Sequence, residues 1–241
     1  MQTALPIDDV MPQVLDALRA RGRLVLQAPP GAGKTTRVPL AILEAGLTTG
    51  RILMLEPRRL AARAAAERMA QTLGEQAGET VGYRVRGASA VSKATRIEVV
   101  TEGILTRMLQ DKPDLPGIGA VIFDEFHERS LNADLGLALS LEIAGTLRDD
   151  LMIVVMSATL ETEAVAQLLG DASVITSTGR SFPVSVEHIE TPIARDRDFP
   201  SAVASSIENI TRKLDGDILV FLPGAGEIMR VAERLGHINA D

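Results

Sequence analysis

A loop of glycine, alanine and proline precedes a Lys-Thr pair near the start of the chain. It reads Ala-Pro-Pro-Gly-Ala-Gly-Lys-Thr over residues 28–35. Gly31 and Gly33 let the backbone approach a polyphosphate closely, and the amides at the start of the next helix bind anions. Lys34 would reach the β- and γ-phosphates, and the Thr35 hydroxyl would ligate Mg²⁺. The strict phosphate-loop pattern has glycine at the position of Ala28, so this loop is a variant of it. The residues expected to contact the nucleotide are Gly31, Ala32, Gly33, Lys34, Thr35 and Thr36.

Two adjacent carboxylates follow the apolar segment Ala120–Phe123, in the run Asp-Glu-Phe-His over residues 124–127. A carboxylate at a strand end that faces a phosphate loop is where a second Mg²⁺ partner is needed, and Asp124 suits that role. Glu125 can polarise the attacking water as general base. His127 would be unusual as a core residue here and joins the catalytic candidates with Lys34. A solvated acidic loop would show the same carboxylates, but their pairing with the phosphate loop favours catalysis.

A Ser-Ala-Thr tripeptide follows the apolar segment Leu151–Met156. The hydroxyls of Ser157 and Thr159 could hydrogen-bond the Asp-Glu carboxylates and sense the γ-phosphate. They could equally cap the helix that is expected to start near Glu161. Both interpretations can hold together.

Strand-like and helix-like segments alternate along the first three quarters of the chain. The expected strands are Leu24–Gln27, Arg51–Leu55, Thr95–Val100, Ala120–Phe123, Leu151–Met156 and Ser173–Thr176. The expected helices are Pro6–Arg21, Lys34–Glu44, Arg58–Leu73, Glu102–Leu109, Leu131–Ala144 and Glu161–Leu169. Such alternation predicts an α/β fold, a parallel sheet with helices on both faces, whose ligands bind at the carboxyl ends of the strands. Each chemical motif lies just after a predicted strand.

Composition changes near residue 180, where prolines and a charged run begin. We therefore divide the chain into a first domain over 1–180, a connector over 181–200 and the beginning of a second domain over 201–241. The last part should hold a helix at Ser201–Leu214, a strand at Asp217–Leu222 and a helix at Ala225–Leu235. One strand and two helices cannot bury a core alone, so we expect this second domain to be cut short.

The composition excludes several classes of protein. The chain has no cysteine, and its three histidines are far apart, so we expect no disulfide framework and no metal cluster. No apolar run is long enough for a membrane span and no signal-peptide pattern is present, so the cytoplasm is the expected compartment. The net charge of −7 argues against general phosphate binding. Arginines are nevertheless concentrated enough for a basic stripe on an acidic body, at Arg51, Arg58, Arg59, Arg63 and Arg68.

Six motifs occur in the order of a superfamily 2 helicase. Besides the three segments above they are Glu-Pro-Arg-Arg at 56–59, Thr-Glu-Gly at 101–103, and Phe-Leu-Pro-Gly at 221–224, while Glu-Arg-Ser at 128–130 extends the acidic motif. The set resembles the DEAH-box/RHA group over nearly the whole chain. The extended loop Ala-Pro-Pro-Gly-Ala-Gly-Lys-Thr-Thr-Arg, and Phe126 where alanine is usual, are most similar to bacterial HrpB-type ATP-dependent helicases.

This resemblance implies a P-loop NTPase with two RecA-like domains that uses ATP and Mg²⁺ and binds single-stranded RNA or DNA. Arg58 and Thr101 match positions that contact the nucleic-acid backbone. Arg68 matches an arginine that stacks on adenine, although a solvated helix face would place an arginine there as well. The family also completes its site with a Gln-x-x-Gly-Arg-x-Gly-Arg run, which these 241 residues lack. We therefore expect this segment to bind nucleotide and hydrolyse it slowly.

Two other functions fit part of the pattern. One is a P-loop ATPase that remodels proteins, and the other is a nucleotide-dependent binding module without catalysis of its own. The Pro-Arg-Arg and Thr-Glu-Gly segments between the ATP motifs favour nucleic acid over a protein substrate. The presence of both Lys34 and Glu125 indicates an intact catalytic site. The leading hypothesis is an ATP-dependent helicase, with RNA and DNA both open as its substrate.

Overall fold

The computed structural model describes residues 4–159, 162–179, 183–189 and 192–236. The chain divides into two compact units, Met1–Ser181 and Phe182–Asp241. The division falls close to the composition change seen in the sequence. The assignment of the second unit to the beginning of another RecA-like domain stays a prediction.

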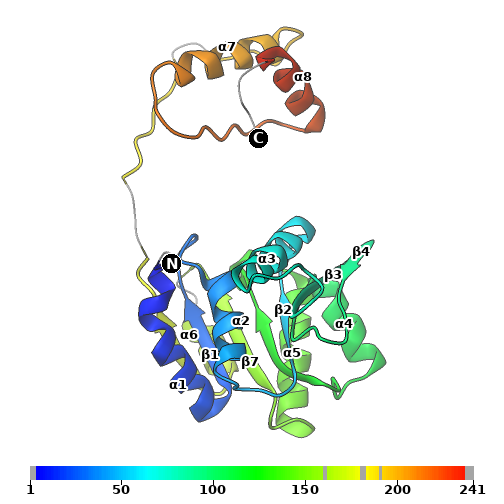
Figure 1. Cartoon of the computed structure of the whole chain (residues 1–241). Helices are drawn as coiled ribbons and strands as arrows, with labels where there is room; N and C mark the ends of the chain where they lie inside the picture. Colours follow the sequence, from blue (N-terminus) through cyan, green and yellow to red (C-terminus); the bar gives the residue numbers. More distant parts are fainter. Residues whose placement is uncertain (1–3, 160–161, 180–182, 190–191, 237–241) are drawn as a thin grey trace. The chain divides into compact units, whose positions relative to one another are not determined.

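Unit 1 is built on one eight-stranded sheet (Figure 1). The strands are β1 (Arg23–Gln27), β2 (Arg51–Leu55), β3 (Val81–Val85), β4 (Ala88–Ala90), β5 (Ile97–Val100), β6 (Ile118–Phe123), β7 (Met152–Ser157) and β8 (Ser173–Thr176). Their order across the sheet is β4-β3-β5-β2-β6-β7-β1-β8. All pairs are parallel except β3 with β4. The predicted α/β fold, with a mostly parallel sheet, is confirmed.

Helices cover both faces of the sheet, as predicted. They are η1 (Pro6–Val10), α1 (Met11–Arg21), α2 (Lys34–Glu44), α3 (Arg59–Thr72), α4 (Glu102–Asp111), η2 (Phe126–Glu128), α5 (Leu131–Thr146) and α6 (Thr162–Leu168). Helices α1, α2 and α3 pack with one apolar cluster, and α4, α5 and α6 with the other. Consecutive residues of one strand point to opposite faces of the sheet and so enter different apolar clusters, as Leu24 and Val25 do. Burial on both faces explains why these strands read as continuous apolar runs.

Two features of unit 1 differ from the prediction. The expected helix over Pro6–Arg21 is divided into η1 and α1, because Pro12 lacks an amide hydrogen and favours the first turn of a new helix. The hairpin of β3 and β4 was not predicted at all. Gly82 and Arg84 interrupt the apolar pattern of β3, and a Cβ on Gly82 would lie 2.3 Å from the Ala90 carbonyl oxygen. Glycine is therefore needed where the strands approach most closely.

Unit 2 consists of α7 (Phe199–Thr211) and α8 (Ala225–Leu235), which pack through Val203, Ala204, Ile207 and Val231. The predicted strand Asp217–Leu222 is wrong, because this segment forms no strand in the structure. Leu219 and Phe221 within it are 79% and 87% exposed. A strand needs a neighbour to satisfy its backbone hydrogen bonds. The described residues of unit 2 contain no other strand that could pair with it.

Candidate functional site

The predicted phosphate loop joins the carboxyl end of β1 to the start of α2. Gly31 and Gly33 have φ of +78° and +95°, a region that side chains rarely adopt. A Cβ on Gly33 would also lie 2.6 Å from Leu5 Cδ1. The Ile7 amide donates to the Ala32 carbonyl at 3.1 Å, which fastens the loop to the N-terminal segment. Both glycines are thus required by the backbone path of the loop.

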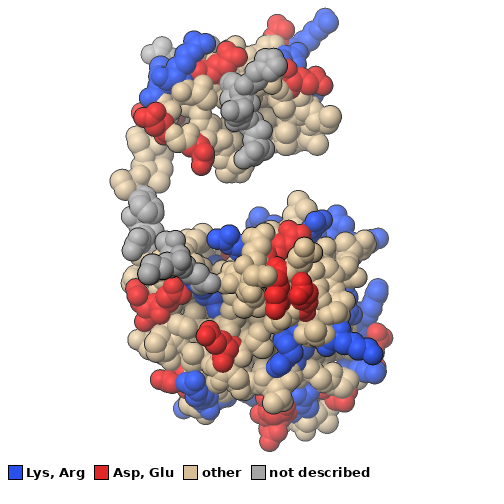
Figure 2. Space-filling model, in the orientation of Figure 1, with Lys and Arg blue, Asp and Glu red and all other residues tan. Residues whose placement is uncertain are grey.

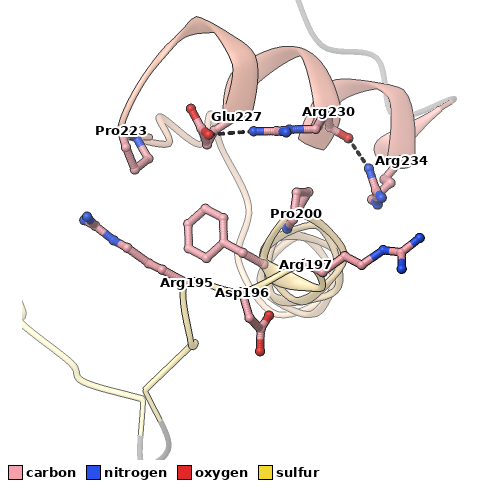
Figure 3. Close-up of a pocket in the computed structure, with 9 residues that line it drawn as sticks. Arg195, Asp196, Arg197, Pro200, Pro223, Glu227, Arg230 and Arg234 are labelled. Carbon is pink, nitrogen blue, oxygen red and sulfur yellow. Dashed lines mark hydrogen bonds and ion pairs between the residues drawn. The ribbon is translucent and has the colours of Figure 1, made fainter.

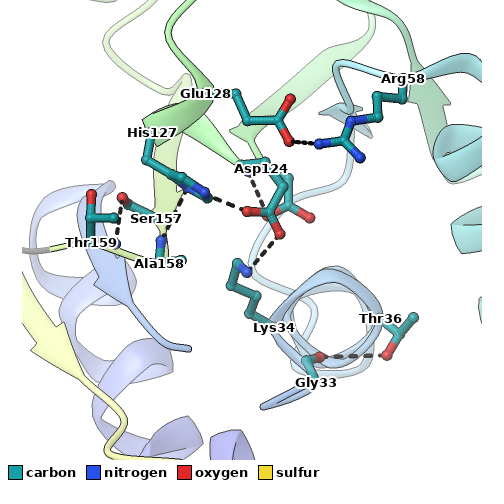
Figure 4. Close-up of polar contacts among 11 residues, drawn as sticks. Gly33, Lys34, Thr36, Arg58, Asp124, His127, Glu128, Ser157, Ala158 and Thr159 are labelled. Carbon is teal, nitrogen blue, oxygen red and sulfur yellow. Dashed lines mark hydrogen bonds and ion pairs between the residues drawn. The ribbon is translucent and has the colours of Figure 1, made fainter. Parts of the chain in front are cut away.

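Lys34 is the first residue of α2, and its side chain is only 4% exposed. Its ammonium lies 2.8 Å from Glu125 Oε1 (Figure 4). A buried ammonium at the positive end of a helix dipole requires an anionic partner, and Glu125 supplies it. Glu125 itself has a φ of +49°, which turns the chain sharply at the end of β6. Such a conformation costs roughly 1 kcal/mol and is typical of functional sites. The structure therefore brings the predicted phosphate-binding lysine and the predicted general base into direct contact.

Asp124 lies at the carboxyl end of β6 and is 4% exposed. Its Oδ1 accepts the Glu125 amide at 2.8 Å, while its Oδ2 is buried with no hydrogen-bond partner. Burial raises the pKa of Asp124 to about 6, against the lowering influence of the Thr35 hydroxyl and the Lys34 ammonium. A buried carboxylate oxygen without a partner is costly unless a cation meets it.

This arrangement fits Mg²⁺. Asp124 presents an unpartnered oxygen next to Thr35, and oxygen ligands of this kind suit a hard cation. No group of three or more His, Cys, Asp or Glu side chains that could hold a metal occurs among the described residues. Magnesium in nucleotide sites commonly takes its other ligands from phosphates and water, so two protein ligands suffice.

His127 connects the acidic motif to the Ser-Ala-Thr motif on the neighbouring strand β7. Its Nδ1 accepts the Ala158 amide at 3.3 Å and lies 3.3 Å from Glu125 Oε2. Ser157 Oγ accepts the Thr159 amide at 3.3 Å. The expected hydrogen bonds from these hydroxyls to the Asp-Glu carboxylates do not occur among the described contacts. The link between the two motifs runs through His127 instead (Figure 4).

The two predicted nucleic-acid residues lie at the same edge of the sheet. Arg58 follows β2 and Thr101 follows β5, and these strands pair with Leu55 opposite Val100. The Arg58 side chain is 71% exposed and forms an ion pair with Glu128, just beyond the acidic motif. Thr101 occupies the N-cap position of α4. The structure thus brings both residues to the side of the sheet that carries the ATP motifs.

The other clustered arginines do not form one basic stripe. Arg51 lies 2.6 Å from the fully buried Glu98, and Arg63 lies 2.7 Å from Glu67, so carboxylates neutralise both. Arg68 is exposed on α3, where its predicted contact with adenine stays a prediction. On the face drawn in Figure 2, Lys and Arg side chains form separate groups between Asp and Glu side chains. Positive charge that could bind a nucleic-acid strand is therefore confined to separate small groups of side chains.

One buried carboxyl at this edge was missed by the sequence reasoning. Glu56 directly follows β2 and is 5% exposed. Burial, together with the charges of Asp124, Glu125 and Glu128, raises its pKa to about 8, against the lowering influence of Arg58. An acidic residue directly after a buried strand was the available signal. Its proximity to Asp124 depends on β2 and β6 being neighbours, which the sequence does not state.

Unit 2 has a hollow of about 460 Å³ beside the start of α7 and along α8 (Figure 3). Four arginines line it: Arg195, Arg197, Arg230 and Arg234. Two of these have partners, since Arg230 lies 2.6 Å from Glu227 and Arg234 donates to Ser201 at 2.8 Å. The lining residues provide no pair of a nucleophile and a base. The predicted catalytic residues all lie in unit 1.

The fold is that of a helicase RecA-like domain, and comparison with known proteins agrees. A family model described as DEAD/DEAH box helicase matches residues 8–168, and the chain belongs to this family. It is 50% identical over 240 residues to the ATP-dependent RNA helicase HrpB of Escherichia coli K12, covering 99% of this chain and 29% of that protein. It is 34% identical to the ATP-dependent RNA helicase HrpA of the same organism, over 98% of this chain and 18% of that protein.

Solved structures lead to the same family. The chain matches the crystal structure of Escherichia coli DEAH/RHA helicase HrpB with a TM-score of 0.86 and 50% identity, over 98% of this chain and 30% of that one. The resemblance to HrpB-type helicases drawn from the sequence is confirmed. The chain spans less than a third of the length of these relatives. Among the described residues, no helix is long and apolar enough to cross a membrane.

Proposed function

We propose that this chain is the ATP-binding part of an ATP-dependent RNA helicase, which couples ATP hydrolysis to movement along or unwinding of nucleic acid. One observation carries the proposal. The buried ammonium of Lys34 lies 2.8 Å from Glu125, beside the buried, unpartnered oxygen of Asp124. In this proposal a phosphate-binding cation, a general base and a cation ligand would meet at one edge of the sheet. The relatives named as ATP-dependent RNA helicases support RNA as the substrate.

The chain's own residues divide the work of phosphoryl transfer. The backbone amides of residues 31–36 would hold the β- and γ-phosphates, and Lys34 would leave Glu125 to meet them. Glu125, once released, would accept a proton from the attacking water. His127, whose Nδ1 accepts the Ala158 amide, would connect the acidic motif to the motif that carries Ser157 and Thr159. Arg68 would stack on the adenine.

Thr35 and Asp124 would hold Mg²⁺, which neutralises charge on the phosphates when bound. Asp124 must be ionised for this role. Because burial raises its pKa to about 6, binding of the cation should drive proton release from Asp124 near and below that pH. ATP and Mg²⁺ are therefore expected to bind together.

We further propose that these 241 residues alone bind nucleotide but hydrolyse it slowly. The chain contains no Gln-x-x-Gly-Arg-x-Gly-Arg run, and its last Gly-Arg pair is Gly179-Arg180, at the end of the first domain. Arginines that contact the transferred phosphoryl group accelerate such reactions by several orders of magnitude. A longer chain that includes this motif should be faster.

The decisive experiment measures ATP hydrolysis with and without single-stranded RNA, in this chain and in a longer one. Stimulation by RNA in the longer chain supports the helicase assignment. Equal rates with and without RNA, combined with stimulation by a protein substrate, would favour the remodelling ATPase. Nucleotide binding without turnover in the longer chain would favour the binding module. Cytoplasmic location stays a prediction.

A further inference from the structure

The short segment after the acidic motif contacts both segments predicted to bind nucleic acid. Glu128 Oε1 pairs with Arg58, and the Ser130 hydroxyl donates to Glu102 Oε2. Arg58 belongs to the segment after β2, and Glu102 directly follows Thr101. Ser130 also caps α5 by accepting the Ala133 amide at 3.0 Å. Residues 128–130 therefore contact both segments predicted to bind nucleic acid and directly follow the acidic motif.

A stiff connection links Glu128 to the predicted general base. The Glu128 amide donates to the Glu125 carbonyl at 2.9 Å across the single turn of η2. Phe126 within that turn is 7% exposed and packs edge-on against Phe123, with ring centroids 6.2 Å apart. Arg129 has a φ of +45° just after the turn. The hydrogen bond across the turn thus ties the backbone position of Glu128 to that of Glu125.

The Arg58–Glu128 pair is suited to being opened. Its side chains are 71% and 32% exposed, and ion pairs this exposed contribute little to stability. A nucleic-acid phosphate offers the Arg58 guanidinium an equally good two-oxygen acceptor with no covalent tie to the ATP site. Binding of a strand would therefore take Arg58 away from Glu128 at low cost.

We propose that Glu128 is a positioning residue that competes with the nucleic-acid backbone for Arg58, so that a bound strand releases Glu128 and the η2 turn that carries Glu125. Ser130 holds the other end of the segment through Glu102. This inference rests on the proposed helicase function. It goes beyond that function by naming the contact through which strand binding reaches the hydrolytic site.

The test uses the longer enzyme that contains this chain and compares Glu128→Gln with wild type. Glutamine keeps the shape but loses the charge, so Arg58 is freed for the strand. We expect about two- to fivefold tighter binding of a fluorescent single-stranded RNA, the range that an exposed ion pair allows. The RNA-dependent increase in kcat should shrink because Glu128 is already released, while the KM for ATP should stay unchanged.

Two further variants separate this role from a structural one. Glu67→Gln breaks the comparably exposed Arg63–Glu67 pair on α3 and should leave RNA affinity and stimulation at wild-type values. The exchange Arg58→Glu with Glu128→Arg keeps an ion pair between the two positions and should leave thermal melting at the wild-type value, while RNA affinity falls below that of wild type. If Glu128→Gln matches Glu67→Gln in RNA affinity, or changes kcat without changing affinity, the competition does not exist. A wild type that is not stimulated by RNA would instead contradict the proposed function.

Discussion

Replacing Lys34 by alanine should abolish most binding of ATP with Mg²⁺ while leaving the chain folded. The ammonium lies 2.8 Å from Glu125, and at an effective dielectric constant of about 20 two unit charges at this distance attract by roughly 6 kcal/mol. Desolvation of both ions offsets most of that attraction. Glu125 is 24% exposed and can regain water when its partner is removed. We therefore expect a loss of about 1–3 kcal/mol of folding free energy, below the typical total of about 5–15 kcal/mol.

The effect of this substitution on nucleotide affinity is larger. Loss of charge-assisted hydrogen bonds to the phosphates removes about 1.5–3 kcal/mol. The carboxylates of Asp124 and Glu125, no longer neutralised, repel the triphosphate and add to this loss. Together they predict an affinity at least about 100-fold weaker. The double variant Lys34→Ala with Glu125→Gln removes part of the repulsion and should recover part of the affinity.

Calorimetric titration with a non-hydrolysable ATP analogue and Mg²⁺ measures the affinity, and thermal melting by circular dichroism measures the fold. Lys93→Ala is the matched control, because Lys93 is an exposed lysine in the segment between β4 and β5. It should bind nucleotide as wild type does. Equal affinity in wild type and Lys34→Ala would refute the phosphate-binding role. An unfolded Lys34→Ala chain would refute the energy assigned to the ion pair.

Three other predictions concern the same edge of the sheet. In a longer enzyme Glu125→Gln should bind ATP normally and lose turnover, because an amide cannot accept the proton of water; wild-type steady-state rates would exclude Glu125 as the base. The pKa of Glu56 is raised by burial from 4.5 to about 8, so the folded state keeps a proton that the unfolded chain releases. Stability should therefore fall as pH rises from about 4.5 to about 8, and Glu56→Gln should melt higher than wild type at pH 8.5; identical melting curves from pH 5 to 8.5 would contradict this. Arg58→Ala should weaken single-stranded RNA binding equally for different sequences and reduce its salt dependence by about one counterion, as fluorescence titrations at two salt concentrations can measure. A change of preference at a single base would argue against a backbone contact.

Local sequence was enough for the elements that bury a continuous apolar run. Strands β1, β2 and β6 were predicted to within two residues at each end, because each is covered by helices on both faces and reads as an uninterrupted apolar segment. The strand predicted at Asp217–Leu222 carries the same kind of pattern and does not form. Its pattern is local, but the hydrogen bonds that make a strand come from a neighbour.

The sequence by itself determined the chemistry available to this protein. The phosphate loop needs glycines and a lysine at fixed spacing, and the acidic motif needs two carboxylates after a strand, so both are visible without a fold. Only the tertiary structure decided which of these groups meet. Lys34 and Glu125 are 91 residues apart in the chain, and Arg58 and Glu128 are 70 apart. Their contacts exist because β6 lies beside β2 and two strands from β1, an order that long-range strand pairing sets and no local pattern encodes.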